Sequence, residues 1–275
     1  MLKPQIIALI VAIVTVIILF NLPKVIINET NKDKLADQSK NQPASSGFAS
    51  PTTRSITKEE LFLIQNLRKN FSTVSDKEKK SIFADSLAKT FVLVQKYDSA
   101  QRYAEEIVLI NQGSKSYKYA ADIYFSIFSA TQDPIWVSSS AEKARNYYQE
   151  VLKSDSNNLA VSNNLAMTYA VSETPMQAVL ILRGVLAKDP ANKDAIFNLG
   201  MLSVRSGQLD KALQRFNSLI EMDSKNWKAH LYLGLVYKEQ NKNMEANKAF
   251  EMVIKNASDK ALIAEAKQNL INSTN

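Results

Sequence analysis

Two consecutive stretches of equal length decide the fold of this chain. Residues 193–226 read KDAIFNLGMLSVRSGQLDKALQRFNSLIEMDSKN, and residues 227–260 read WKAHLYLGLVYKEQNKNMEANKAFEMVIKNASDK. Aligned without gaps, both place Leu-Gly at positions 7 and 8, Ala at position 20 and Phe at position 24. Self-similarity at a period of 34 residues predicts an array of repeated structural units.

The pattern extends upstream by one further period. Four columns recur in three copies: Leu165, Leu199 and Leu233; Ala166, Gly200 and Gly234; Ala178, Ala212 and Ala246; Leu182, Phe216 and Phe250. The first two columns share one face of a first helix, and the last two lie one turn apart on a second helix. Small residues let the two helices approach closely, and the large ones fill the space toward the next pair. One such hairpin cannot bury its apolar face alone, so neighbours must stack.

These residues resemble the tetratricopeptide repeat, whose Leu-Gly-x-x-Tyr, Ala-x-x-x-Phe and closing Pro match residues 232–237, residues 246–250 and Pro190. The resemblance implies an all-α, right-handed α-solenoid of helix hairpins. Weaker matches extend the array to about five units over 81–260. The units are expected at 81–114, 115–158 with a loop insertion, 159–192, 193–226 and 227–260. We expect an N-terminal capping helix in 57–80, which begins at a capping box of Thr57 and Glu60, and a C-terminal capping helix in 261–275.

An apolar segment precedes the repeats. Residues 6–20 contain one non-apolar residue, Thr15, and apolar character resumes at Leu22 and 25–27. A bilayer span needs about 20 residues, so 6–27 predicts one transmembrane helix that follows a short cytoplasmic tail, with Lys24 reaching the headgroups. No small-residue cleavage pattern follows, which favours an uncleaved signal anchor. The alternative is a buried core helix.

Residues 28–56 are almost entirely polar and predict a flexible linker. The charges on the two sides of the span favour opposite orientations, because Lys3 favours a cytoplasmic N-terminus whereas four lysines lie at or beyond the C-terminal end of the span. A short tail with one uncleaved span commonly leaves the large domain outside. We therefore expect a single-pass bacterial protein of the inner (cytoplasmic) membrane with a periplasmic or extracytoplasmic C-terminal domain, and a cytoplasmic domain is the alternative.

The composition argues against several chemistries. With no Cys and one His, the chain lacks thiol nucleophiles and Cys/His zinc sites, and its six glycines do not form a phosphate-binding motif. The net charge of +7 is diluted along the chain, since residues 1–55 hold six basic and three acidic residues. We expect no enzyme activity, no cofactor, no metal and no nucleic-acid partner.

The family resemblance also implies a concave groove lined by the first helices. The residues that we assign to partner binding there are Asn163, Met167, Ala170, Phe197, Met201, Val204, Leu231, Leu235 and Lys238. The groove floor is largely apolar, and its methionines suit an adaptable surface. The alternative is that the Met and Leu side chains only pack between adjacent first helices. Some family members bind a C-terminal carboxylate, but only Asn198 and Lys228 match that clamp, which favours an apolar or amphipathic helical ligand.

Trp136 and His230 lie outside this set of groove residues and are interpreted separately. The insertion at 130–140 is expected to be a loop that displays Trp136, which either contacts a partner or fills a gap between units. His230 has no second His or Cys for catalysis and is expected to be a half-buried structural residue.

These features together predict a membrane-tethered scaffold or adaptor that binds a protein or peptide in its groove and contacts the lipid bilayer through residues 6–27. The alternative is a structural role, either as a constitutive subunit of a cell-envelope complex or as a self-associating homo-oligomer.

Overall fold

The computed structural model describes residues 55–270, all of whose regular elements are α-helices. The helices are α2 (Lys58–Thr73), α3 (Lys77–Leu93), α4 (Tyr97–Ile110), α5 (Ser114–Ala130), α6 (Pro134–Ser154), α7 (Leu159–Tyr169), α8 (Met176–Lys188), α9 (Lys193–Arg205), α10 (Leu209–Met222), α11 (Trp227–Glu239), α12 (Asn243–Asn256) and α13 (Lys260–Asn269). None of these helices is long and apolar enough to cross a membrane. The anchor expected at 6–27 and most of the linker at 28–56 lie outside the described residues.

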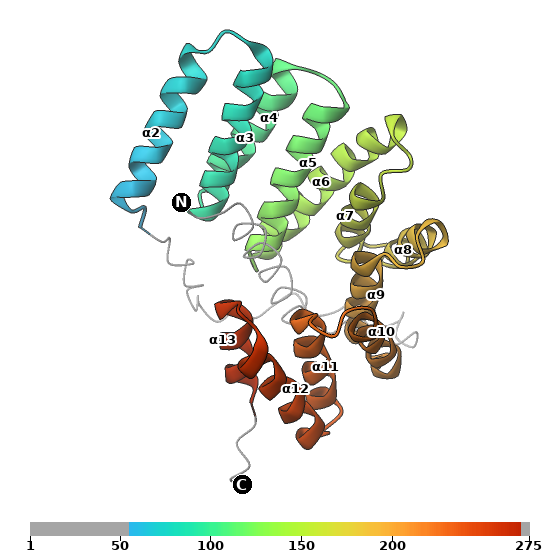
Figure 1. Cartoon of the computed structure of the whole chain (residues 1–275). Helices are drawn as coiled ribbons and strands as arrows, with labels where there is room; N and C mark the ends of the chain where they lie inside the picture. Colours follow the sequence, from blue (N-terminus) through green and yellow to red (C-terminus); the bar gives the residue numbers. More distant parts are fainter. Residues whose placement is uncertain (1–54, 271–275) are drawn as a thin grey trace, which may run out of the picture.

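Consecutive helices pair into antiparallel hairpins that stack side by side. The hairpins are α3–α4, α5–α6, α7–α8, α9–α10 and α11–α12, with α2 and α13 as single helices at the two ends. Figure 1 shows the stack as a curved array. Neighbouring odd-numbered helices contact one another, α3 with α5, α7 with α9 and α11 with α13, as expected on the inner side of a curve.

The helices of each hairpin approach closely where the first helix carries a small residue. A Cβ atom added at Gly200 would lie 2.7 Å from Cε1 of Phe216, and one added at Gly234 would lie 2.6 Å from Cε1 of Phe250. Both rings are fully buried, so they cannot easily move aside. Glycine is therefore required at positions 200 and 234 so that the two helices of each hairpin can fit together.

Helix starts and turns repeat with the same period. Asn158, Asn192 and Asn226 cap α7, α9 and α11, and each side-chain oxygen accepts a hydrogen bond from the backbone N–H three residues later. Gly207 adopts φ +71°, as a tight helix–helix turn requires, and Asn241 occupies the equivalent position with φ 58°. The capping box of Thr57 and Glu60 is present at the start of α2.

Residues 134–140 of the insertion are helical, which corrects the loop expected from the sequence, and only 131–133 connect α5 to α6 without helical structure. Asp133 caps α6 by accepting from Ile135 N–H at 2.9 Å, and Pro134 occupies the first helical turn, where its missing N–H costs nothing. The extra residues thus lengthen α6. Trp136 is partly buried against the core, with its ring centroid 5.5 Å from that of Tyr97. It packs between units, while Ile135 stays exposed.

The glycine contacts give a matched pair of substitutions. Gly200→Ala should lower the free energy of unfolding by about 1 to 3 kcal/mol relative to Gly184→Ala, because the new methyl group overlaps the Phe216 ring. Gly184 lies in α8 with no atom near its missing Cβ, so its substitution should be neutral or stabilise by up to about 1 kcal/mol. Denaturant titrations of both variants test the difference, and equal stabilities would contradict the packing described here.

Candidate functional site

The candidate site is the inner face, defined as the surface formed by α3, α5, α7, α9, α11 and α13. Six of the nine predicted groove residues are buried in the described chain: Asn163, Met167, Ala170, Met201, Leu231 and Leu235. Phe197 and Val204 are half-buried, and Lys238 is exposed. The six buried side chains pack within the described chain, and partner binding by the nine residues stays a prediction.

Asn163 illustrates the structural use of an inner-face position. Its Nδ2 donates to Oδ1 of Asn192 at 3.0 Å, and Asn192 is the residue that caps α9. The side chain of Asn163 is therefore committed to holding the start of the following repeat. Its burial leaves little surface for a partner to contact.

Phe197 lies at the centre of an aromatic and charged cluster that joins α9, α11 and α13. Its ring contacts Tyr232 edge-on, with centroids 5.0 Å apart, and the Lys228 Nζ atom lies 3.9 Å from its centroid. Asp194 on α9 and Glu265 on α13 both influence Lys228 electrostatically. The sequence analysis missed Glu265, because α13 was assigned only a capping role.

Burial is the largest cause of the pKa shifts of Lys228 and Glu265 in this cluster. It lowers the pKa of Lys228 to about 8, although Asp194 and Glu265 oppose the shift. Burial also raises the pKa of Glu265, against the attraction of Lys228. Part of the Lys228 side chain remains exposed, but its ammonium group interacts with the Phe197 ring, a cation–π contact that replaces some of the lost hydration.

A second polar cluster crosses the N-terminal half of the inner face. Asp122 on α5 accepts from Lys118 Nζ at 2.6 Å and from the Tyr148 hydroxyl at 2.9 Å. Asn164 on α7 donates to the same hydroxyl at 3.1 Å, so one network joins α5, α6 and α7. Burial, followed by the charge of Asp122, raises the pKa of Tyr148 well above its usual value, which keeps this tyrosine protonated.

Asp85 on α3 lies next to this network. Its Oδ2 accepts from Lys89 Nζ at 2.7 Å, while its Oδ1 is buried without a hydrogen-bond partner. Burial raises the pKa of Asp85, Lys89 opposes the shift, and Asp122 adds to it through like-charge repulsion. No groove residues were predicted from the sequence in the first two units. The predicted unit 115–158 starts one residue after α5, which begins at Ser114, and a unit counted from Ser114 places Lys118 and Asp122 at the positions of Phe197 and Met201.

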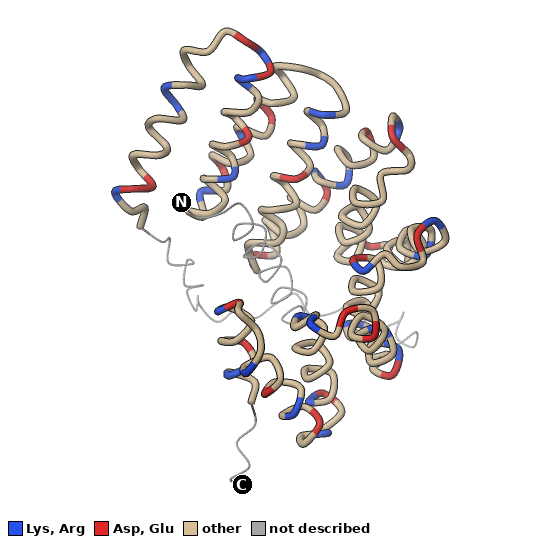
Figure 2. The backbone as a smooth tube through the Cα atoms, viewed as in Figure 1, with Lys and Arg blue, Asp and Glu red and all other residues tan. Residues whose placement is uncertain are grey.

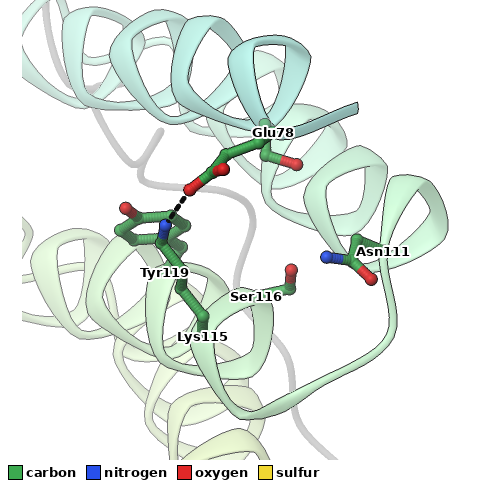
Figure 3. Close-up of a pocket in the computed structure, with 6 residues that line it drawn as sticks. Glu78, Asn111, Lys115, Ser116 and Tyr119 are labelled. Carbon is green, nitrogen blue, oxygen red and sulfur yellow. Dashed lines mark hydrogen bonds and ion pairs between the residues drawn. The ribbon is translucent and has the colours of Figure 1, made fainter. Parts of the chain in front are cut away.

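Two cavities lie outside these clusters. The first, of about 200 Å³, opens at the starts of α3 and α5, where Glu78 pairs with Lys115 beside Asn111, Ser116 and Tyr119 (Figure 3). The second, of about 400 Å³, lies between α6 and the turn after α7. Most of the residues that line both cavities have polar or charged side chains, and the exposed wall of the second cavity is mainly polar, unlike the mainly apolar walls of small-molecule sites.

The remaining chemistry of the described residues is modest. Within 55–270 no group of three or more His, Asp or Glu side chains could hold a metal ion. The Nε2 atom of His230 lies 3.1 Å from the carbonyl oxygen of Ser224. The His230 ring also stacks on the Trp227 ring, with ring centroids 5.4 Å apart. Figure 2 shows acidic and basic residues intermixed along the array. This intermixing of acidic and basic residues suits an extended binding surface of mixed polarity.

Comparisons with known proteins agree with this architecture. The sequence profile of the tetratricopeptide repeat matches residues 197–261. A tetratricopeptide repeat protein from Parabacteroides merdae is similar in structure, with a TM-score of 0.60 and 15% identity over 77% of this chain and 79% of that one. A thermophilic tetratricopeptide repeat protein from Thermus thermophilus gives a TM-score of 0.54 and 15% identity over 69% of this chain and 98% of that one. No curated protein matches the chain significantly. Residues 197–261 thus match the tetratricopeptide repeat, and the described chain has the solenoid fold of such repeats.

The pKa of Lys228 predicts a dependence of stability on pH. Lys228 has a pKa of about 8 in the folded chain and an ordinary value of 10.5 when unfolded, so the unfolded chain binds more protons between these values. The stability of the wild type should therefore rise, relative to that of Lys228→Met, as the pH increases from about 8 to about 10. Thermal melts across this range test the effect.

The matched control for this measurement is Lys248→Met, which removes an exposed lysine on α12. Its melting temperature should follow that of the wild type at every pH. If the curves of the wild type and Lys228→Met also run parallel, Lys228 is not a buried cation.

Proposed function

We propose that this chain is a non-enzymatic scaffold, tethered to a membrane, that binds an amphipathic segment of another protein along its inner face. The observation that carries the proposal is the mixed character of the inner-face side chains that remain accessible. They include the half-buried Phe197 and Val204 and the exposed Lys238, together with Lys89 and Lys118 at the N-terminal half. Tetratricopeptide repeats are a fold built for protein–protein contact, which supports a protein as the partner.

The geometry favours an amphipathic ligand over a purely apolar one. Met167, Met201 and Leu231 are buried by their own neighbours, so the chain offers no continuous apolar floor. The accessible lysines are held in place by carboxylates, Lys89 by Asp85 and Lys118 by Asp122. Side chains positioned in this way lose less entropy when they contact a partner, and they select for polar groups at fixed spacing.

The membrane tether in this proposal rests on the sequence. The apolar residues 6–27 have the length of a bilayer span, and the polar residues 28–56 would let the solenoid stand off the bilayer surface. We further propose a single-pass protein of the inner membrane of a bacterium, with the solenoid outside the cytoplasm. In the alternative location the same solenoid would face the cytoplasm.

Photo-crosslinking in intact cells tests where the partner binds. A photoreactive residue at Lys89 or Lys238 on the inner face should give adducts with a partner protein. The same residue at Leu109 on α4 or at Lys248 on α12 should give none, because these exposed positions lie on the second helices of the same two hairpins. Adducts are resolved by gel mobility and identified by mass spectrometry.

Two results would contradict the proposal. Equal adduct yields at the inner and outer positions would move the binding surface away from the inner face. Adducts composed only of two copies of this chain would support the structural alternative, in which the solenoid self-associates.

A further inference from the structure

The first helix of the array carries an apolar tip that the solenoid leaves uncovered. Ile64 of α2 is buried, and Leu67 and Phe71 pack with it against the core. Leu61, Phe62 and Leu63 are 48%, 66% and 47% exposed. Because three successive residues span about 200° of a helix, these three side chains form an exposed apolar arc, which directly follows the exposed charged residues Lys58 and Glu59 at the start of α2.

The character of this arc changes along the helix. After Leu63 the exposed positions become polar, and they include the basic residues Arg68 and Lys69. The apolar tip is therefore confined to the end of α2 at which the chain enters from residues 1–56. Figure 1 shows α2 at the edge of the array, where it packs against α3 on one side.

We propose that the α2 tip, defined as Leu61, Phe62 and Leu63, is a second membrane contact that seats this end of the solenoid in the interfacial region of the bilayer. The inference rests on the proposed function, because it needs the apolar segment 6–27 to bring α2 to a membrane. That segment ends about thirty residues before the tip, and a coil of that length spans on the order of 30 Å. The tip is thus held close to the surface at high effective concentration.

The available area favours a bilayer over a second copy of the chain. Three partly exposed side chains offer roughly 300 Å², given about 150–250 Å² for a whole aromatic side chain. A stable protein interface needs about 800 Å² from each partner. A tethered membrane contact has no such requirement, since a few apolar side chains and nearby lysines or arginines suffice for interfacial binding. Lys69, about two turns beyond the tip, is placed to meet anionic headgroups, whereas the Arg68 guanidinium lies 5.4 Å from the centroid of the Phe91 ring on α3.

The docked tip would also fix the orientation of the solenoid. With the anchor and the tip both at the membrane, α2 could no longer rotate freely on its linker. The inner face would then be presented at a defined angle to the bilayer, which suits a partner that is itself membrane-bound.

The full chain provides a direct test because it contains no cysteine. Single-cysteine variants Phe62→Cys and Met176→Cys, labelled with the same environment-sensitive dye, form a matched pair, since both positions are 66% exposed. The labelled chains are reconstituted into vesicles of phosphatidylcholine and phosphatidylglycerol with or without brominated acyl chains. We expect bromine to quench the dye at position 62 several-fold more strongly than the dye at position 176.

A second variant shows whether the neighbouring side chains hold the tip in the membrane. Leu61→Ser with Leu63→Ser, made in the Phe62→Cys background, should reduce the quenching at position 62 to the level at position 176. Its melting temperature should change little, because each leucine is already about half exposed in the folded chain.

The possible results distinguish a failure of the α2 tip to dock from a failure of the membrane tether. If the chain floats with vesicles but the dyes at 62 and 176 are quenched equally, the tip does not dock and the inference is wrong while the tether stands. If the wild-type chain does not float with vesicles, both the tether and the docking fail. Energy transfer between labels at position 62 on different copies, without quenching by bromine, would assign the tip to self-association and overturn the inference.

Discussion

The close approach of two helices at one small residue per hairpin is the constraint on which the rest of the structure depends. The α9 and α11 helices meet it with Gly200 and Gly234, and α3, α5 and α7 carry the fully buried alanines Ala88, Ala121 and Ala166. Where the partner helix supplies a phenylalanine, even a methyl group does not fit. This fit sets the distance between the two helices of a hairpin, and stacking then determines the curve of the array.

The curve has a consequence for the inner face. Because odd-numbered helices crowd together on that side, methionine and leucine side chains that point inward are buried by their neighbours. The side chains that remain accessible include Lys89 and Lys118, which are held by ion pairs, and Lys238, whose Nζ donates to Asn269 Oδ1 at 3.1 Å. The partly buried Lys228 shows the cost of this crowding, since its pKa falls to about 8 despite the nearby carboxylates. The inner face is therefore a surface of positioned polar groups on a tightly packed base.

Much of this fold follows from sequence periodicity, whereas the binding surface does not. The columns at 165–182, 199–216 and 233–250 predicted the hairpins because each column has one packing role. Three capping asparagines at the same spacing, Asn158, Asn192 and Asn226, carried a further signal that the sequence analysis did not use. Trp136 was assigned to a loop because extra residues were taken as unstructured, although Asp133-Pro134 is a helix start. Burial of Met201 depends on how closely neighbouring hairpins stack, which no single repeat encodes.

A double-mutant cycle on Gly200 and Phe216 tests the central claim most directly. The claim is that the small residue and the ring fit against each other, so that each limits the size of the other. Phe216→Leu removes the ring atoms that crowd Gly200 and leaves a smaller buried side chain. The account predicts that Gly200→Ala destabilises the chain much less in the Phe216→Leu background than in the wild type, with a coupling free energy of about 1 kcal/mol or more. Additive effects of the two substitutions would contradict it.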